Sequence, residues 1–292
     1  MGKSKKLHAS GEIDKSMSAN ARRAIAYIVL VIICFFCLVW FALLVLNATK
    51  SNNELKLAFT FKPSNYFIIN FKNMLRDQLD IFKGLRNSLI IAASSSLLSV
   101  YFSTMTAYAI HAYDFKLKKY IFTFILMIMM IPTQVTTLGF IDLMGDFGLV
   151  DTFWPLIIPS IAAPAVFFYL KQYMESALPL SLIEAARIDG SNEFRTFNSI
   201  VLPLMKPALA VQAIFAFTAS WNNYFVPTYI LESDNKKTLP ILIALLRSRD
   251  PSALDSGVVY MMIVVAILPV VIIYLILSKH IVAGVALGSV KG

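Results

Sequence analysis

Charge is scarce in this sequence of 292 residues, and six long stretches have none. Asp, Glu, Lys and Arg make up 15% of the chain, whereas a soluble globular domain has about 25%. Each charge-free stretch is 19 to 25 residues long, and about 20 apolar residues let a helix cross the hydrocarbon core of a membrane. A backbone in lipid must bond its polar groups internally, so the sequence predicts an all-α polytopic membrane protein with six transmembrane helices. The predicted spans are Ala24–Leu46, Ser88–Ile110, Tyr120–Ile141, Thr152–Leu170, Pro207–Leu231 and Val258–Ser278.

Histidine and cysteine are also rare, at three and two copies, which leaves little material for a metal site. No H-E-x-x-H or G-x-S-x-G pattern is present. Cys34 and Cys37 share one apolar run without the βαβ context of a redox C-x-x-C, which favours small packing residues. Gly2-Lys3-Ser4 lacks the first glycine of a nucleotide phosphate loop. We therefore expect no catalytic, metal or cofactor site, and no ATPase site in this chain.

The predicted spans lack the intramembrane carboxylates and bases that proton-coupled carriers and pumps use. A sodium site built from neutral oxygens stays open. The net charge of +9 comes from residues that flank the spans and forms no basic stripe interleaved with aromatics, so we expect contact with lipid and none with nucleic acid.

Lysine and arginine are unevenly divided between the two sides of the predicted bundle. With a cytoplasmic N-terminus, inside segments hold 15 of the 26 basic residues and outside segments 11, and cytoplasmic segments carry the excess. We expect a multi-pass membrane protein with a cytoplasmic N-terminus (1–23), a membrane domain (24–278) and a cytoplasmic tail (279–292). No small-residue cleavage site follows the first span, which is therefore expected to stay as a helix. In the fourth span, Pro155, Pro159 and Pro164 predict a kink.

The segment between the fourth and fifth spans, residues 171–206, differs from a simple connector. Ser181 and Glu184 have the spacing of a capping box, which predicts a helix start. Gly190 supplies a stop with positive φ, Ser191 can cap a second short helix, and Leu202-Pro203 ends that helix before the fifth span. The prediction is a cytoplasmic helix–turn–helix, with an amphipathic helix resting on lipid headgroups as the alternative.

At this loop the sequence resembles the binding-protein-dependent ABC importer permeases. The order Glu184-Ala185-Ala186, three residues, Gly190, nine residues, Ile200-x-Leu202-Pro203 is similar to their EAA-x3-G-x9-I-x-L-P loop. Further motifs resemble the shorter, six-span permease of carbohydrate importers of the maltose and multiple-sugar type. They are Asn87-Ser88-Leu89, Ala107-Tyr108-Ala109, Ile131-Pro132, Gly148 to Thr152, Trp221-Asn222 and the terminal Gly288 to Gly292. After Pro132 the chain departs from the family, which usually has a second proline and an aromatic where this sequence has Thr136 to Phe140.

The resemblance implies a pore subunit of the bacterial inner membrane that couples to a cytoplasmic ATPase by alternating access. It implies as partners a second, homologous permease, two copies of the ATPase subunit, an extracytoplasmic solute-binding protein and a sugar. The residues it assigns to the ATPase contact are Glu184, Ala185, Ala186, Asp189, Gly190, Ile200, Leu202 and Pro203. It assigns a second contact to the tail residues Gly288, Lys291 and Gly292, for which a frayed terminus is the alternative.

Candidates for the solute pathway are two aromatics and two amides together in the fifth span, Trp221, Asn222, Asn223 and Tyr224, with Gln134 as a weaker candidate in the third. Aromatic faces and amide hydrogen bonds suit a neutral sugar. The alternative is that the asparagines bond neighbouring helices.

Two other functions compete with the sugar importer. An ion-coupled secondary carrier predicts an internal repeat with broken helices, and no convincing repeat is seen. An ABC permease for another solute, such as a peptide or a phosphate ester, is disfavoured by the resemblance along the whole chain.

Overall fold

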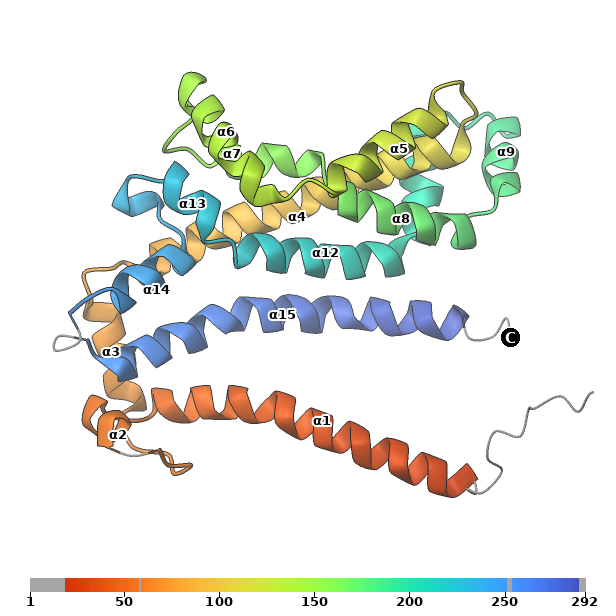
Figure 1. Cartoon of the computed structure of the whole chain (residues 1–292). Coiled ribbons are helices and arrows are strands. Elements are labelled where there is room, and N and C mark those ends of the chain that lie inside the picture. The colour runs from red at the N-terminus through yellow and green to blue at the C-terminus, as the bar shows by residue number, and fades with distance from the viewer. Residues whose placement is uncertain (1–18, 58, 251–253, 289–292) are drawn as a thin grey trace, which may run out of the picture.

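The computed structural model describes residues 19–57, 59–250 and 254–288, and every regular element in these ranges is a helix (Figure 1). The longer helices are α1 (Ala19–Ala48), α3 (Phe67–Arg76), α4 (Ile81–Ala112), α5 (Lys118–Met129), α6 (Thr133–Asp146), α8 (Pro164–Ala177), α12 (Lys206–Trp221) and α15 (Ser256–Gly288). The shorter α-helices are α2 (Asn52–Leu57), α7 (Trp154–Ile157), α9 (Leu180–Ile188), α10 (Glu193–Thr196), α11 (Leu202–Leu204), α13 (Phe225–Ile230) and α14 (Leu239–Arg247). Two 3-10 turns, η1 (Ile158–Ile161) and η3 (Asp234–Lys236), and a π-helical turn, η2 (Phe197–Val201), complete the described elements.

The long helices run side by side and define two ends of the molecule (Figure 1). The start of α1, the end of α15 and helix α9 lie at one end, at the right of the figure, which we call the α9 end. Helices α2, α3, α13 and α14 lie at the other, the α14 end. The predicted cytoplasmic loop thus shares an end with the two helices that lead to the chain termini.

Four segments of the described chain are long and apolar enough to cross a membrane singly: α1, α4, Trp154–Ala177 and α15. Two more are obtained if each of two bent helix pairs counts as one span, α5 with α6 and Glu193–Leu204 with α12. The prediction of an all-α polytopic membrane protein is confirmed, and each predicted span has a helical counterpart. In the fourth span the three prolines divide the chain into α7, η1 and α8, each proline standing in the first positions of its piece, where a missing N–H costs least.

The third predicted span is helical but is not one continuous helix. Its two halves, α5 and α6, meet at an angle of 96°. Pro132 lies at the break with extended backbone, as the N-cap of α6. A proline has no N–H to donate to the hydrogen bonds of a helix, and it disfavours helical backbone angles at the residue before it. Helix α5 therefore ends before Pro132.

The fifth predicted span is also interrupted, contrary to expectation. Helix α12 ends at Trp221, and α13 begins only at Phe225. Pro227 accounts for the break, because its ring would clash with the carbonyl of Asn223 in a continuous helix.

Helix α4 is the centre of the packed bundle, and small polar residues line its buried face. Ser95, Ser96 and Ser103 are buried, and each hydroxyl donates to a backbone carbonyl of a neighbouring segment, at 2.9 to 3.4 Å. Small residues let helices approach closely in a membrane, where lipid removes the hydrophobic drive to associate.

Helix α1 stands away from the bundle along most of its length (Figure 1), and Cys34 and Cys37 are exposed on it. The expectation that the two thiols pack within the chain is therefore wrong. The helix is fixed at its end, where Asn70 donates to the Ala48 and Lys50 carbonyls at 2.8 Å. A Cβ on Gly257 would lie 2.7 Å from both Asn70 Nδ2 and the Lys50 oxygen, so this junction requires glycine.

Candidate functional site

The loop between the fourth and fifth spans folds into the predicted helix–turn–helix, but its first cap is different. Helix α9 begins after Pro179, which has extended backbone and makes no side-chain capping bond. Ser181 already lies inside the helix, so the predicted capping box is wrong. The reason is Pro179, which disfavours helix at Leu178 and lets a new helix start directly after it.

Gly190 ends α9 with a φ of +78°, as predicted. The N–H of Ser191 then donates to the Ala186 carbonyl at 3.0 Å, which closes the helix. Asn192, not Ser191, caps α10, since its Oδ1 accepts from the N–H of Arg195 at 2.8 Å. The prediction of Ser191 as the cap is wrong by one residue. The backbone N–H of Ser191 closes α9, and its hydroxyl accepts a hydrogen bond from the Thr196 hydroxyl.

The second helix ends at Leu204, directly after Leu202-Pro203 and before the fifth span, as predicted. Helix α11 is its last turn, and the chain bends by 83° between Leu204 and Lys206. Pro203 is accommodated by the π-helical turn before it, in which the Leu202 N–H bonds to the Phe197 carbonyl five residues back. Of the other predicted contact residues here, Ile200 is half-buried.

One face of α9 is buried, and the other carries exposed apolar side chains. Ile183 and Ala186 are buried, so Ala186 contacts this chain and does not face a partner as expected. Glu184, Ala185, Asp189 and Gly190 are exposed. Ile188 is 86% exposed and Phe194, on α10, 68%. Helix α9 lies across the end of the bundle (Figure 1), so these side chains form a surface that a partner can reach.

A charged cluster connects α9 and α10 to α4. Arg187 Nε donates to Glu193 Oε1 at 2.7 Å, and the Tyr108 hydroxyl donates to Glu193 Oε2 at 2.7 Å. The guanidinium of Arg187 lies 5.1 Å from the ring centre of Tyr113. Sequence reasoning gave Glu193 and Tyr108 no role and took Arg187 only as a charge that the loop offers to a partner, although Arg187 and Tyr108 lie in two of the quoted motifs.

The candidates for solute contact in the fifth span differ in burial: Trp221, the last residue of α12, is buried, and the residues after it are more exposed. Trp221 is buried, stacks on Phe217 with ring centres 5.6 Å apart, and donates its indole N–H to the Ala266 carbonyl at 3.1 Å. Its polar atom is already used inside the bundle, which indicates a packing role. Asn222 is exposed, Asn223 is half-buried, and Tyr224 is 44% exposed.

Trp221, Asn222 and Tyr224 line a cavity of about 670 Å³ between α1, α12, α14 and α15. The rest of its lining is apolar apart from Arg247 and Tyr274. Gln134 is exposed on α6 and does not line this cavity. Asn223 does not line it either.

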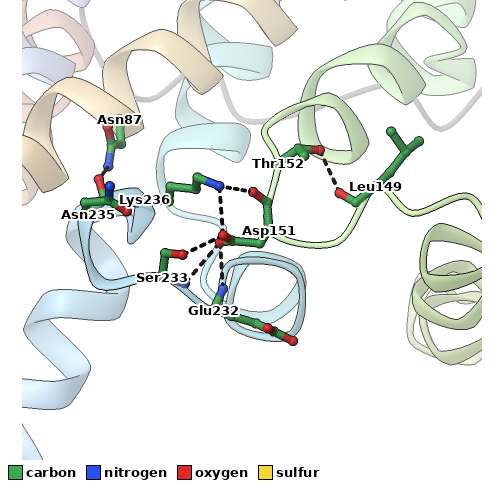
Figure 2. Close-up of polar contacts among 8 residues, drawn as sticks. All are labelled: Asn87, Leu149, Asp151, Thr152, Glu232, Ser233, Asn235 and Lys236. Carbon is green, nitrogen blue, oxygen red and sulfur yellow. Dashed lines mark hydrogen bonds and ion pairs between the residues drawn. The ribbon is translucent and has the colours of Figure 1, made fainter.

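A second polar cluster lies at the opposite end of the bundle, around Asp151 (Figure 2). Asp151 Oδ1 accepts from the backbone N–H groups of Glu232 and Ser233 at 3.1 and 3.0 Å. Its Oδ2 accepts from the Ser233 hydroxyl at 2.5 Å and from Lys236 Nζ at 2.7 Å. Asp151 has a φ of +57°, a backbone region that aspartate tolerates better than most side chains. The hydrogen bonds from Lys236 and Ser233 hold the pKa of Asp151 well below its ordinary value.

Two residues at the start of α4 bind the same loop. Asn87 Nδ2 donates to the carbonyls of Asn235 and Lys237 at 2.9 and 3.1 Å, and the Ser88 hydroxyl accepts from the Leu239 N–H at 2.8 Å. A cavity of about 1110 Å³ lies beside them, lined by Arg86, Asn87, Asp151, Trp154 and Lys236 among others. Asn87, Ser88 and Asp151 lie in motifs noted in the sequence, but their partners are 81 or more positions away, which no local pattern reveals.

Residues 99–286 match the family model of the binding-protein-dependent transport system inner membrane component. The chain belongs to this family. An arabinooligosaccharides transport system permease protein, AraQ of Halalkalibacterium halodurans, is 35% identical over 252 residues, which cover 85% of this chain and 89% of that protein. The melibiose/raffinose/stachyose import permease protein MelC of Bacillus subtilis is 28% identical and covers 95% of this chain and 100% of its own length.

This permease also has the fold of a solved relative. A chain from the crystal structure of a bacterial ABC transporter involved in the import of the acidic polysaccharide alginate superposes with a TM-score of 0.77. It covers 91% of the permease and 99% of its own chain at 22% identity. Of the predicted tail contact, Gly288 is the last residue of α15, and Lys291 and Gly292 lie outside the described residues. Within the described part of the permease, no group of three or more His, Cys, Asp or Glu side chains could hold a metal ion.

Proposed function

We propose that this permease forms half of the pore of an ATP-driven importer of sugars or oligosaccharides, and that its α9–α10 segment contacts the ATPase subunit. The observation that carries the proposal is that the segment exposes apolar side chains on one face while its other face is packed against the bundle. Ile188 and Phe194 are exposed, while Ile183 and Ala186 fix the opposite face of α9. Contiguous exposed apolar side chains mark interaction sites.

Coupling from outside the membrane fits the composition of the spans. The charge-free stretches offer no proton relay, so the force for alternating access has to enter at an end of the bundle. A rigid helix across that end can pass a partner's movement to the spans packed beneath it. The ATPase is therefore placed at the α9 end, which makes that end, both termini and the 171–206 loop cytoplasmic.

The other partners follow from the same assembly. A second, homologous permease completes the pore, two ATPase subunits bind its cytoplasmic face, and a solute-binding protein delivers solute at the α14 end. The chain itself supplies no hydrolytic chemistry.

The solute class rests on relatives and on the amides near Trp221. Several relatives are named for oligosaccharide transport. Asn222 and Tyr224 line the 670 Å³ cavity, and their side-chain polar groups make no hydrogen bond among the described residues. Asn223 and Gln134 stay weaker candidates, because neither lines this cavity. An amide beside an aromatic ring suits a neutral hydroxyl-rich solute.

The experiment is reconstitution. The tagged permease is purified in mild detergent with whatever co-purifies and is placed in liposomes with radiolabelled oligosaccharides. The proposal expects a second permease and an ATPase subunit in the preparation, and uptake that requires ATP and a binding protein. A chain that purifies alone and moves solute without ATP would contradict it and favour a secondary carrier.

A further inference from the structure

We propose that Tyr108, Glu193 and Arg187 are positioning residues that pass the movement of α9 to α4, and through α4 to the α14 end. The inference rests on the proposed contact between α9 and the ATPase. It adds the route by which that contact acts on the pore.

The first step is the carboxylate of Glu193, which bonds two different elements at once. One oxygen accepts from Arg187 in α9 and the other from Tyr108 in α4, each at 2.7 Å. A carboxylate is rigid, and hydrogen bonds to a charged acceptor are short and strong. A single group thereby links the position of α9 to that of α4.

The second step is the burial of Tyr108. Its side chain is 4% exposed and contacts the ring of Phe197, with centroids 5.7 Å apart. A buried hydroxyl has no water to replace a lost partner. The bond to Glu193 therefore stays made while the loop moves, whereas the half-exposed Arg187–Glu193 pair can exchange with water.

The third step is α4 itself. This helix has 32 residues, which is about 48 Å at 1.5 Å per residue. Tyr108 lies near its last turn, and Asn87 and Ser88 near its first, where they bind the loop that holds Lys236. A displacement at Tyr108 thus reaches the cluster around Asp151 without passing through any flexible connection.

The test is the number of solute molecules imported per ATP hydrolysed, measured with the complete importer in proteoliposomes. Tyr108→Phe removes only the hydroxyl. The inference expects the complex to co-purify as in the unaltered protein and to hydrolyse ATP, while uptake per ATP falls about tenfold, equivalent to about 1.4 kcal/mol of coupling. Tyr169→Phe is the matched control, since the hydroxyl of this exposed tyrosine of α8 makes no hydrogen bond among the described residues. Its uptake per ATP should not change.

A second variant keeps the inference testable if Tyr108→Phe folds poorly. Glu193→Gln retains an acceptor for Tyr108 but loses the charge that binds Arg187, and should also lower uptake per ATP. If the residues act as a unit, the double variant loses no more than the worse single variant.

An unchanged ratio in Tyr108→Phe would overturn the inference. So would loss of the ATPase from the complex in both variants, because the cluster would then serve only to shape the docking surface. Failure of the proposed function looks different, since the unaltered protein would then yield no ATPase and no ATP-dependent uptake.

Discussion

The two ends of α4 are both held by polar clusters, but the clusters differ in what they bond. At the α14 end, Asp151, Asn87 and Ser88 bond mainly to backbone groups of one loop. At the α9 end, Glu193 bonds side chain to side chain, and exposed apolar residues such as Ile188 lie nearby. Bonds to backbone fix a loop in one shape, while bonds between side chains join elements that keep their own shape. The bonds at the α14 end suit a part of the protein that keeps its shape. The bonds at the α9 end suit a contact between elements that move as units.

The largest effect should come from Gly190→Val at the α9 end. A β-branched residue resists the φ of +78° at this position, so the turn should distort and transport should be lost while the protein still inserts in the membrane. Uptake in whole cells and the amount of protein in membranes are the measurements. Gly145→Val is the control, because Gly145 has no neighbouring atom within 4 Å and no positive φ. Normal uptake by Gly190→Val would remove the case for this turn.

At the α14 end, Asp151→Ala should affect stability first. It leaves two backbone N–H groups and the Ser233 hydroxyl without their acceptor and removes the carboxylate that pairs with Lys236, at a cost of about 2 kcal/mol. The midpoint of thermal unfolding in detergent should fall by about 5 °C. Asp151→Asn should cost less, since asparagine tolerates the same backbone region and can still accept hydrogen bonds. Equal midpoints for all three proteins would show that the cluster does not hold this end together.

The same cluster predicts a pH dependence with a definite sign. The folded-state pKa of Asp151 is depressed, so its contribution to stability is complete above the unfolded-state pKa and is lost as pH falls through the folded-state value. The difference in unfolding midpoint between the unaltered protein and Asp151→Asn should stay constant from pH 8 to about pH 5 and shrink only at lower pH. A difference that already changes between pH 8 and pH 6 would contradict the assignment.

The smallest effect should come from Asn222→Ala, which probes the solute pathway between the two ends. Loss of one hydrogen bond of about 1 kcal/mol should raise the KM for solute about fivefold and leave ATPase binding unchanged. Asn73→Ala, at an exposed amide of α3, is the control. An unchanged KM would show that Asn222 does not contact solute and would favour the alternative that its amide has a structural role.

Composition predicted the class of fold because charge is costly in lipid and its absence is visible in one sequence. The helix breaks were harder to predict. Pro132 ends a helix, yet Pro269 lies inside the continuous α15, and only the surrounding packing distinguishes the two.

In the candidate site, single residues predicted the structure correctly where the backbone conformation requires one residue type. They failed at helix starts, where several residue types can act as the cap. The positive φ at Gly190 was predicted because few residues other than glycine adopt it readily. Ser181 and Ser191 were plausible caps, but Pro179 and Asn192 took those positions. The partners of Asp151 and Tyr108 could not be predicted, because they lie 81 to 85 residues away in the chain.

The most direct test of the α9 end as the ATPase contact is cross-linking in native membranes. In a background with Cys34→Ser and Cys37→Ser, a single Ile188→Cys is treated with a short bifunctional reagent, and Leu57→Cys at the other end is the control. The two positions are equally open, at 86% and 83% exposure. The account predicts that Ile188→Cys cross-links to the ATPase subunit and Leu57→Cys does not. Cross-linking of the ATPase from Leu57→Cys, or from neither position, would contradict it.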